Sequence, residues 1–341
     1  RFQLVQQGFN HIGGELMATT RAYYSTDSGA PTLTGQAGSL LNLLDTCLVG
    51  TAGVAYGSKA AAGWTKPYTG INKAAFRNSV VEGGTGSYVR IDDTAAQTAL
   101  VRAYSTMTDV DTGTAPCPLT TGTYASGGLL PKSNTADSTQ RAWALFADEL
   151  TWYLWWHRGG NRMWQFAGGG DFDSFIPSDP NRYFLIFIKS GWNSNGGSCY
   201  AATMSSAYSG FADQGLLIAD SYAPSGTPQD FSPLYLKTSD SEIGGASVVM
   251  PSPSPGTGLN MYMPYFIGAQ NIIRGRLRGL RCPLNNMMPI VAPDVTGALV
   301  ADVGVTGEPP GSSFMLMPIN SGTGNNTGVT GCLAVETVVD W

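Results

Sequence analysis

Segment 141–166 constrains the fold more than any other part of this chain, because it concentrates five of the eight tryptophans. Two runs of large apolar side chains, residues 143–147 and 151–156, are separated by two acidic residues. Aromatic and β-branched side chains suit a pleated, half-buried surface, and a short acidic break between two such runs is typical of a tight turn. The pattern predicts a central β-hairpin, followed by a third strand over residues 163–167.

This hairpin is expected to supply the core, since each buried aromatic ring removes a large apolar area from water. Residues 183–189 read YFLIFIK, a near-continuous apolar run that is typical of a strand buried on both faces. The large side chains that we expect in the core are Trp143, Phe146, Trp152, Leu154 and Phe187. An aromatic platform for a ligand, built from Trp155, Trp156 and Trp164, stays open as the alternative.

Outside the hairpin, the chain carries one clear helical pattern. Leucines and a cysteine recur at helical spacing over residues 38–49, with Ser39 as a candidate N-cap and Gly50 just after the end. The apolar stripe of this helix is expected to pack on a sheet. A second helix over residues 95–103 stays open because of their alanines, although residues 100–107 also fit a strand.

Short apolar runs make up most of the remaining chain, and loops rich in Gly, Ser, Thr and Pro separate them. The further strands that we expect are residues 19–24, 72–78, 87–92, 215–220, 234–238, 262–268, 295–303, 313–319 and 332–339. Their lengths and spacing are typical of sandwiches and barrels. We therefore predict a mainly β fold, sandwich-like or barrel-like, with one or two short helices and long loops.

Composition narrows the classes of partner. Only 13% of the residues are charged and the net charge is −5, so the chain offers no basic field for nucleic acid. A surface with so few charges suggests cover by neighbouring subunits. No apolar run is long enough to span a bilayer. The five cysteines are widely spaced and form no CxxC pair, which favours buried thiols over a zinc site or a disulfide framework.

Residues 1–16 stand apart from the rest of the chain, because residues 17–20 (MATT) resemble a natural translation start. We interpret residues 1–16 as an N-terminal extension, a docking arm or an alternative start, with Phe2, Leu4 and Val5 available to pair with or dock on a neighbour. Residues 17–341 form one β-rich domain, and a subdivision is open near the Pro/Ser/Gly-rich residues 251–258.

Carboxylates are the strongest candidates for chemistry. Asp171 and Asp173, in the string GGGDFDSF, would point the same way along a strand, as a glycosidase pair or a calcium site requires. The competing interpretation is that they cap turns beside glycines. With only His11 and His157 in the chain, and no HxH or HExxH spacing, we predict no metal site, no cofactor and no catalytic residues.

Residues 272–281 (IIRGRLRGLR) form the sole basic run, with Arg274, Arg276, Arg278 and Arg281. A phosphate or DNA contact would need these arginines to face a channel. Because the run is short and stands alone in an acidic chain, an inter-subunit salt-bridge patch is the interpretation that we favour.

Several strings resemble a family of structural proteins of tailed bacteriophages. The strings are MATTRAYYSTDSGAPTLTGQAGSLLNLLDTCLV (17–49), GSKAAAGWTKPYTGINKAAFR (57–77), YVRIDDT (88–94), YSTMTDVDTGTAPCP (104–118), PKSNTADSTQRAWALFADELTWYL (131–154) and IIRGRLRGL (272–280). The resemblance begins at Met17 and does not include residues 1–16. The resemblance implies no catalytic residues in this chain.

The resemblance implies a non-enzymatic virion component that assembles with copies of itself and with other virion proteins. The resemblance does not place the protein within the particle. Our own expectation is the tail apparatus, as a fibre, collar or baseplate-like part, with synthesis in the cytoplasm of a bacterial host. A capsid decoration protein is the first alternative. A carbohydrate-binding module that recognises a host surface glycan is the second, with the tryptophans as sugar platforms.

Overall fold

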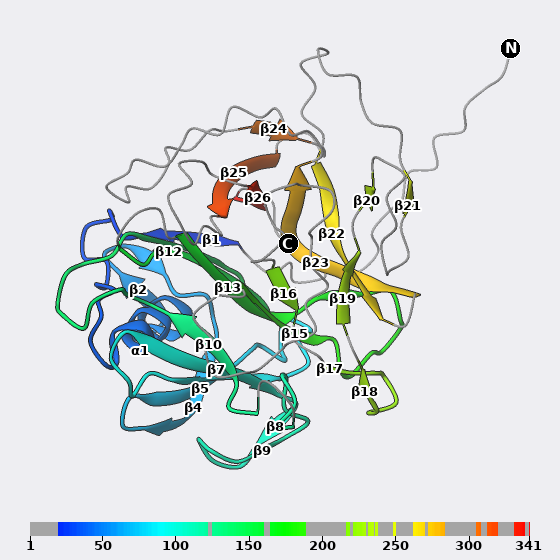
Figure 1. The fold of residues 1–341 in the computed structure, drawn as a ribbon, viewed down its shortest axis with the longest axis horizontal. Coiled ribbons are helices and arrows are strands. Elements are labelled where there is room, and N and C mark those ends of the chain that lie inside the picture. Colours follow the sequence, from blue (N-terminus) through cyan, green and yellow to red (C-terminus); the bar gives the residue numbers. More distant parts are fainter. Residues whose placement is uncertain are drawn as a thin grey trace, which may run out of the picture.

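The computed structural model shows a mainly β chain in which three antiparallel sheets are stacked (Figure 1). The residues that it describes are 20–121, 125–159, 164–188, 216–218, 221–229, 231–234, 236–237, 248–249, 262–269, 272–283, 305–307, 312–319, 331–337 and 341. None of the described sheets closes into a barrel. The predicted mainly β class is confirmed, and the sandwich-like alternative describes it better than the barrel-like one.

The central sheet has six strands and contains the tryptophan-rich hairpin. Its order is β1 (Arg21–Tyr24), β11 (Trp143–Ala147), β12 (Thr151–His157), β13 (Trp164–Asp171), β15 (Tyr183–Ile188) and β16 (Leu216–Ile218). Trp143 pairs with Trp156 and Ala147 with Trp152, so the predicted hairpin is present. Every residue of β11 and β12 is buried, which shows that both faces of this sheet are covered.

A five-stranded sheet covers one face of the central sheet. Its order is β10 (Gly128–Pro131), β7 (Thr98–Tyr104), β6 (Tyr88–Asp92), β5 (Lys73–Arg77) and β4 (Thr65–Gly70). The alternative helix over residues 95–103 does not form, because residues 98–104 are strand β7. The apolar alternation of β7 buries Ala99, Val101 and Ala103 on one face, and this alternation outweighs the helix propensity of alanine.

A seven-stranded sheet covers the opposite face. Its order is β19 (Phe231–Leu234), β22 (Tyr262–Ala269), β23 (Ile272–Pro283), β26 (Gly331–Glu336), β25 (Ser312–Ile319) and β24 (Val305–Gly307), and β14 (Asp173–Ser174) pairs with β23. The basic run at residues 272–281 is thus part of the 12-residue strand β23, which the sequence did not predict. The expected strand at residues 295–303 lies outside the described residues, as do the connector 251–258 and residues 1–16.

Four two-stranded ribbons complete the described strands. They are β2 (Val54–Tyr56) with β3 (Lys59–Ala60), β8 (Thr106–Met107) with β9 (Gly113–Thr114), β17 (Ser221–Tyr222) with β18 (Pro228–Gln229), and the parallel pair β20 (Leu236–Lys237) with β21 (Val248–Val249). No helix among the described residues is long and apolar enough to cross a membrane.

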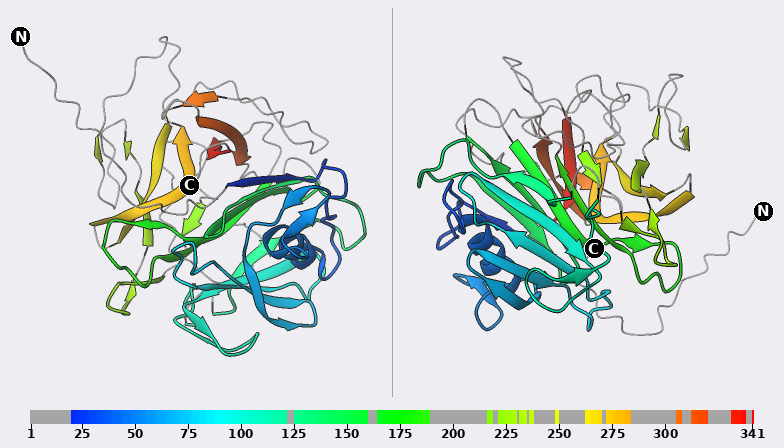
Figure 2. Two further views of the ribbon diagram at one scale, coloured as in Figure 1. Left: turned by 180° about the vertical axis from the view of Figure 1, so that it is seen from behind. Right: turned by 60° about the horizontal axis from the view of Figure 1, so that its bottom comes forward.

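The three layers are visible from two directions in Figure 2, with the green strands of the central sheet between the light-blue to cyan strands β4 to β7 and the yellow to red strands. Side chains alternate between the two neighbours along the hairpin. Trp143, Leu145, Trp152, Leu154 and Trp156 pack toward the five-stranded sheet, and Ala144, Phe146, Tyr153 and Trp155 pack toward the seven-stranded sheet. The five predicted core residues, Trp143, Phe146, Trp152, Leu154 and Phe187, are all buried.

The predicted helix forms as α1 (Ser39–Leu44), which continues as a π-helical turn over Asp45–Val49. Its leucines pack in the apolar layer between the central and five-stranded sheets, as expected. The predicted Ser39 cap is wrong, because no side chain of this segment caps the helix. The carboxylate of Asp93 does so instead: one oxygen accepts the N–H groups of Leu40 and Leu41 at 2.8 and 3.1 Å.

Candidate functional site

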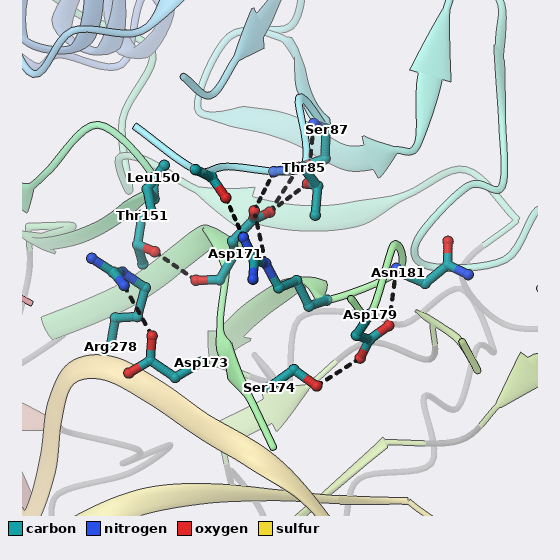
Figure 3. Close-up of polar contacts among 12 residues, drawn as sticks. Thr85, Ser87, Leu150, Thr151, Asp171, Asp173, Ser174, Asp179, Asn181 and Arg278 are labelled. Atoms are coloured by element: carbon teal, nitrogen blue, oxygen red, sulfur yellow. Dashed lines mark hydrogen bonds and ion pairs between the residues drawn. The ribbon is translucent and has the colours of Figure 1, made fainter. Parts of the chain in front are cut away.

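The segment that links β13 to β15 runs from the central sheet to the seven-stranded sheet and back, and it contains the two aspartates singled out from the sequence (Figure 3). It begins at Asp171 in the central sheet and pairs with β23 of the seven-stranded sheet through Asp173 and Ser174. It returns to the central sheet at Tyr183. We call residues 171–182 the crossing segment.

Asp171 joins the crossing segment to the loop between β5 and β6 of the five-stranded sheet. Its carboxylate accepts the main-chain N–H of Thr85 at 2.6 Å and the hydroxyls of Thr85 and Ser87 at 2.7 and 3.2 Å. Arg182 Nε lies 3.5 Å from Oδ2. Burial raises the pKa of Asp171, and the donors from Thr85 oppose that rise.

The position before Asp171, at the end of β13, requires a glycine. Gly170 has φ +123, a conformation that side chains rarely adopt, and a Cβ there would lie 2.1 Å from the carbonyl oxygen of Leu150. The Gly168–Gly170 run therefore has a structural use. It brings β13 close to the β11–β12 turn, where Thr151 Oγ1 donates to the Asp171 carbonyl at 2.6 Å.

Asp173 and Asp148 share one arginine of the seven-stranded sheet. Arg278 places Nη1 2.9 Å from Asp173 and Nη2 2.7 Å from Asp148, and Nη2 also donates to the main-chain oxygen of Trp341. Asp148 is fully buried in the β11–β12 turn, where its other oxygen accepts the N–H groups of Leu150 and Thr151. One guanidinium therefore ties the central sheet to the seven-stranded sheet.

Arg274 and Asp179 form a second buried ion pair beneath the crossing segment. Two nitrogens of Arg274 bind the two carboxylate oxygens of Asp179 at 2.8 and 3.0 Å, a fork geometry that is favourable for charge-assisted hydrogen bonds. Asp179 also accepts from the Ser174 hydroxyl and the Asn181 N–H. Both side chains are almost completely buried, so this pair orders the loop that carries it.

Each arginine of the basic run has a carboxylate partner in its own chain, which was not expected from the sequence. Arg276 Nε lies 3.1 Å from Asp173, and Arg281 lies 3.7 Å from Glu336. The inter-subunit salt-bridge patch stays a prediction for Arg276, whose side chain is 45% exposed. Buried Arg274 and largely buried Arg278 are used inside the chain, and they do not line an open channel for DNA.

The aspartate pair does not form a carboxylate dyad. Asp171 ends β13 and faces Thr85 and Ser87 of the five-stranded layer, whereas Asp173 lies in β14 and faces arginines of β23. Because the chain changes sheets between them, the expectation that both point the same way is wrong. Their oxygens are satisfied by different partners, which is the arrangement of structural carboxylates.

Burial also excludes a ligand platform made from the tryptophans of β12. Trp155 and Trp156 are 0% and 1% exposed, so neither ring is available to stack on a sugar. The side chain of Trp164 lies outside the described part. Phe2, Leu4, Val5 and His11 lie outside it as well. His157 ends β12 as a buried strand-end histidine that accepts the N–H of Gly159 on Nδ1, and burial lowers its pKa.

Sequence reasoning missed Asp179, Thr85 and Ser87, which complete the polar contacts of the crossing segment. No local pattern marks them, because their partners lie between 84 and 95 residues away in the chain. Cys47 and Cys117 are buried free thiols, as expected for scattered cysteines. Among the described residues, no cluster of His, Cys, Asp and Glu could hold a metal ion.

Comparison with protein-family models and with curated proteins finds no match to this chain.

Proposed function

We propose that this chain is a non-enzymatic structural component of a tailed bacteriophage virion, located in the tail apparatus and acting through contacts between subunits. The observation that carries the proposal is the resemblance of its sequence strings to that class of structural protein. These strings fall on β1, α1, β4, β5, the β11–β12 hairpin and β23, and so on the framework of all three layers.

The candidate site supports a structural role for the crossing segment. Asp148, Asp171 and Asp179 each accept several hydrogen bonds inside the chain, and each joins segments that are distant in sequence. A general acid or a nucleophile needs a reacting atom within hydrogen-bond reach, and these carboxylates direct their oxygens at protein donors. Such a network holds three sheets in one arrangement, which is what a subunit of a large assembly requires.

Cryo-electron microscopy of purified particles, with mass spectrometry of their proteins, tests this proposal. We expect the three-layer fold at a symmetric position on the tail. Density on the capsid shell would replace the tail assignment by the decoration alternative. Absence of the chain from every particle fraction would contradict the proposal, and glycan-binding and hydrolysis assays would then be the next measurement.

A further inference from the structure

A lysine and an aspartate, Lys132 and Asp93, meet in the interior between the five-stranded sheet and α1. Both side chains are 0% exposed. Nζ of Lys132 donates to Oδ1 of Asp93, and it donates to the carbonyl oxygen of Gln36 at 2.6 Å. Asp93 follows β6 and Lys132 follows β10, so the pair joins two loops at the end of the sheet where β7 begins.

Complete burial distinguishes this pair from the other lysine–aspartate pairs in the described part of the chain. Lys59 and Asp27, for example, expose 34% and 24% of their side chains and keep part of their hydration. Two ions without water are costly, and a proton that moves from the ammonium to the carboxylate removes both charges. Burial accordingly raises the pKa of Asp93, which favours the neutral acid. The interior therefore favours an uncharged amine beside an uncharged carboxyl group.

The two oxygens of Asp93 have different surroundings. Oδ1 faces the amine of Lys132, whereas Oδ2 accepts the main-chain N–H groups of Leu40 and Leu41 at 2.8 and 3.1 Å. If the amine attacked the carboxyl carbon, negative charge would develop on the oxygen that is held by these two N–H groups. Main-chain N–H groups directed at such an oxygen stabilise the transition state of acyl transfer.

The amine is held in place from both ends of its side chain. The Lys132 main-chain N–H donates to the carbonyl oxygen of Gln97 at 2.8 Å, and the Gln36 carbonyl fixes the direction of Nζ. Two reacting groups that are held in contact react as parts of one molecule, without the entropy cost of an encounter. Exclusion of bulk water also protects the product from hydrolysis.

We propose that Lys132 and Asp93 condense to an isopeptide bond within the folded chain. The bond between Nζ and Cγ forms and the bond between Cγ and Oδ1 breaks. Oδ1 leaves as water with two of the three ammonium protons, and the third proton stays on the amide nitrogen. The step consumes no oxidant, reductant or other reactant, and Oδ2 keeps its hydrogen bonds to α1. This inference does not depend on the proposed virion role.

Mass spectrometry of the purified full chain under denaturing conditions tests the bond. We expect a mass lower than that of the sequence by one water molecule. Trypsin cannot cleave after an acylated lysine, so digestion should yield residues 91–102 attached to residues 103–141, with fragment ions that place the link at Asp93 and Lys132. A chain of full mass that gives residues 91–102, 103–132 and 133–141 as separate peptides would overturn the inference.

Two variants show whether a loss of water belongs to this pair. Lys132→Met removes the amine and should have the full mass of its sequence. Lys59→Met is the matched control, because it removes the amine of a partly exposed pair, and it should keep the loss of water. A loss of water that persists in Lys132→Met would place the dehydration elsewhere and overturn the inference. The peptide map of the wild type decides the question even if Lys132→Met does not fold.

Discussion

Toward the five-stranded sheet, the central hairpin presents Trp143, Trp152 and Trp156 among leucines and the helix, whereas toward the seven-stranded sheet it presents Phe146, Tyr153 and Trp155. On the first face, indole N–H groups bind carbonyl oxygens at the edge of the layer, at 3.0 Å for Trp143 and 2.9 Å for Trp156. Most of the stabilisation on this face comes from apolar area, which is not directional.

On the second face, aromatic rings pack against each other. The ring centroids of Trp155 and Phe166 lie 4.4 Å apart, and Phe146 meets Trp155 edge-on at 5.9 Å. The margin of this interface is closed by Arg278 between Asp148 and Asp173. Because ion pairs and ring contacts are directional, the packing on this face depends on the position of individual atoms.

Truncation in the two apolar layers should give the largest effects. Trp152→Ala on the first face and Phe146→Ala on the second each leave a cavity in a fully packed core, and each should lower the free energy of unfolding by about 3–5 kcal/mol. Denaturant unfolding followed by tryptophan fluorescence and circular dichroism measures the change. Wild-type stability in either variant would contradict the burial of that face.

Arg278→Met should come next and tests the second face alone. It leaves the buried carboxylate of Asp148 without its guanidinium, which should cost about 3 kcal/mol or more. Arg276→Met is the matched control on the same strand: its side chain is 45% exposed, and its loss should change stability by about 0–1 kcal/mol. Equal losses in the two variants would show that Arg278 does not hold the two sheets together.

The close approach of β14 to β23 is tested by Gly275→Ala. A Cβ at Gly275 would lie 2.2 Å from the carbonyl oxygen of Asp173, so backbone must move, at a cost of about 1–3 kcal/mol. Gly70→Ala in β4 serves as control, since a Cβ there meets only ordinary contacts at 3.5 Å or more. A Gly275→Ala variant as stable as Gly70→Ala would mean that β14 does not lie against β23 as described.

The difference between the faces also explains what the sequence could predict. Tryptophans and leucines with strand or helix periodicity identified the hairpin, α1 and the five core residues, because burial of apolar area follows periodicity. Pairs such as Arg278 with Asp148, 130 residues apart, leave no local pattern. The arginines of β23 were therefore interpreted as a basic patch, although Arg274, Arg278 and Arg281 pair with buried carboxylates. Gly275 allows the close approach of β14.

The change of sheet at Asp171 was unpredictable for a similar reason. A strand period of two placed Asp171 and Asp173 on one face, but that inference needs one continuous strand. Here Phe172 lies between two strands of different sheets, and its buried ring packs with the apolar residues of the seven-stranded side. The partner of β14 determines this break, because Asp173 and Ser174 pair with Arg276 and Gly275 of β23, about 100 residues further along the chain.

The smallest expected effect concerns Asp171. It tests whether burial or hydrogen bonding determines the pKa of this carboxylate. Burial raises its pKa in the folded state above the ordinary value of 3.8, so the folded chain binds this proton more tightly than the unfolded chain. The contribution of Asp171 to stability is therefore fully present below about pH 3.8 and declines as the pH rises through the folded-state pKa. Relative to Asp171→Asn, which does not titrate, the wild-type chain should lose stability over that interval.

The contribution of Asp111 to stability should have the opposite pH dependence. The hydrogen bond from Arg90 lowers the pKa of Asp111, so its contribution is present above about pH 3.8 and is lost as the pH falls through the folded-state pKa. Unfolding curves of the wild type, Asp171→Asn and Asp111→Asn across the acidic range should therefore show differences from the wild type with opposite slopes. Slopes of the same sign would mean that the hydrogen bonds from Thr85 and Ser87, with the charge of Arg182, outweigh burial at Asp171.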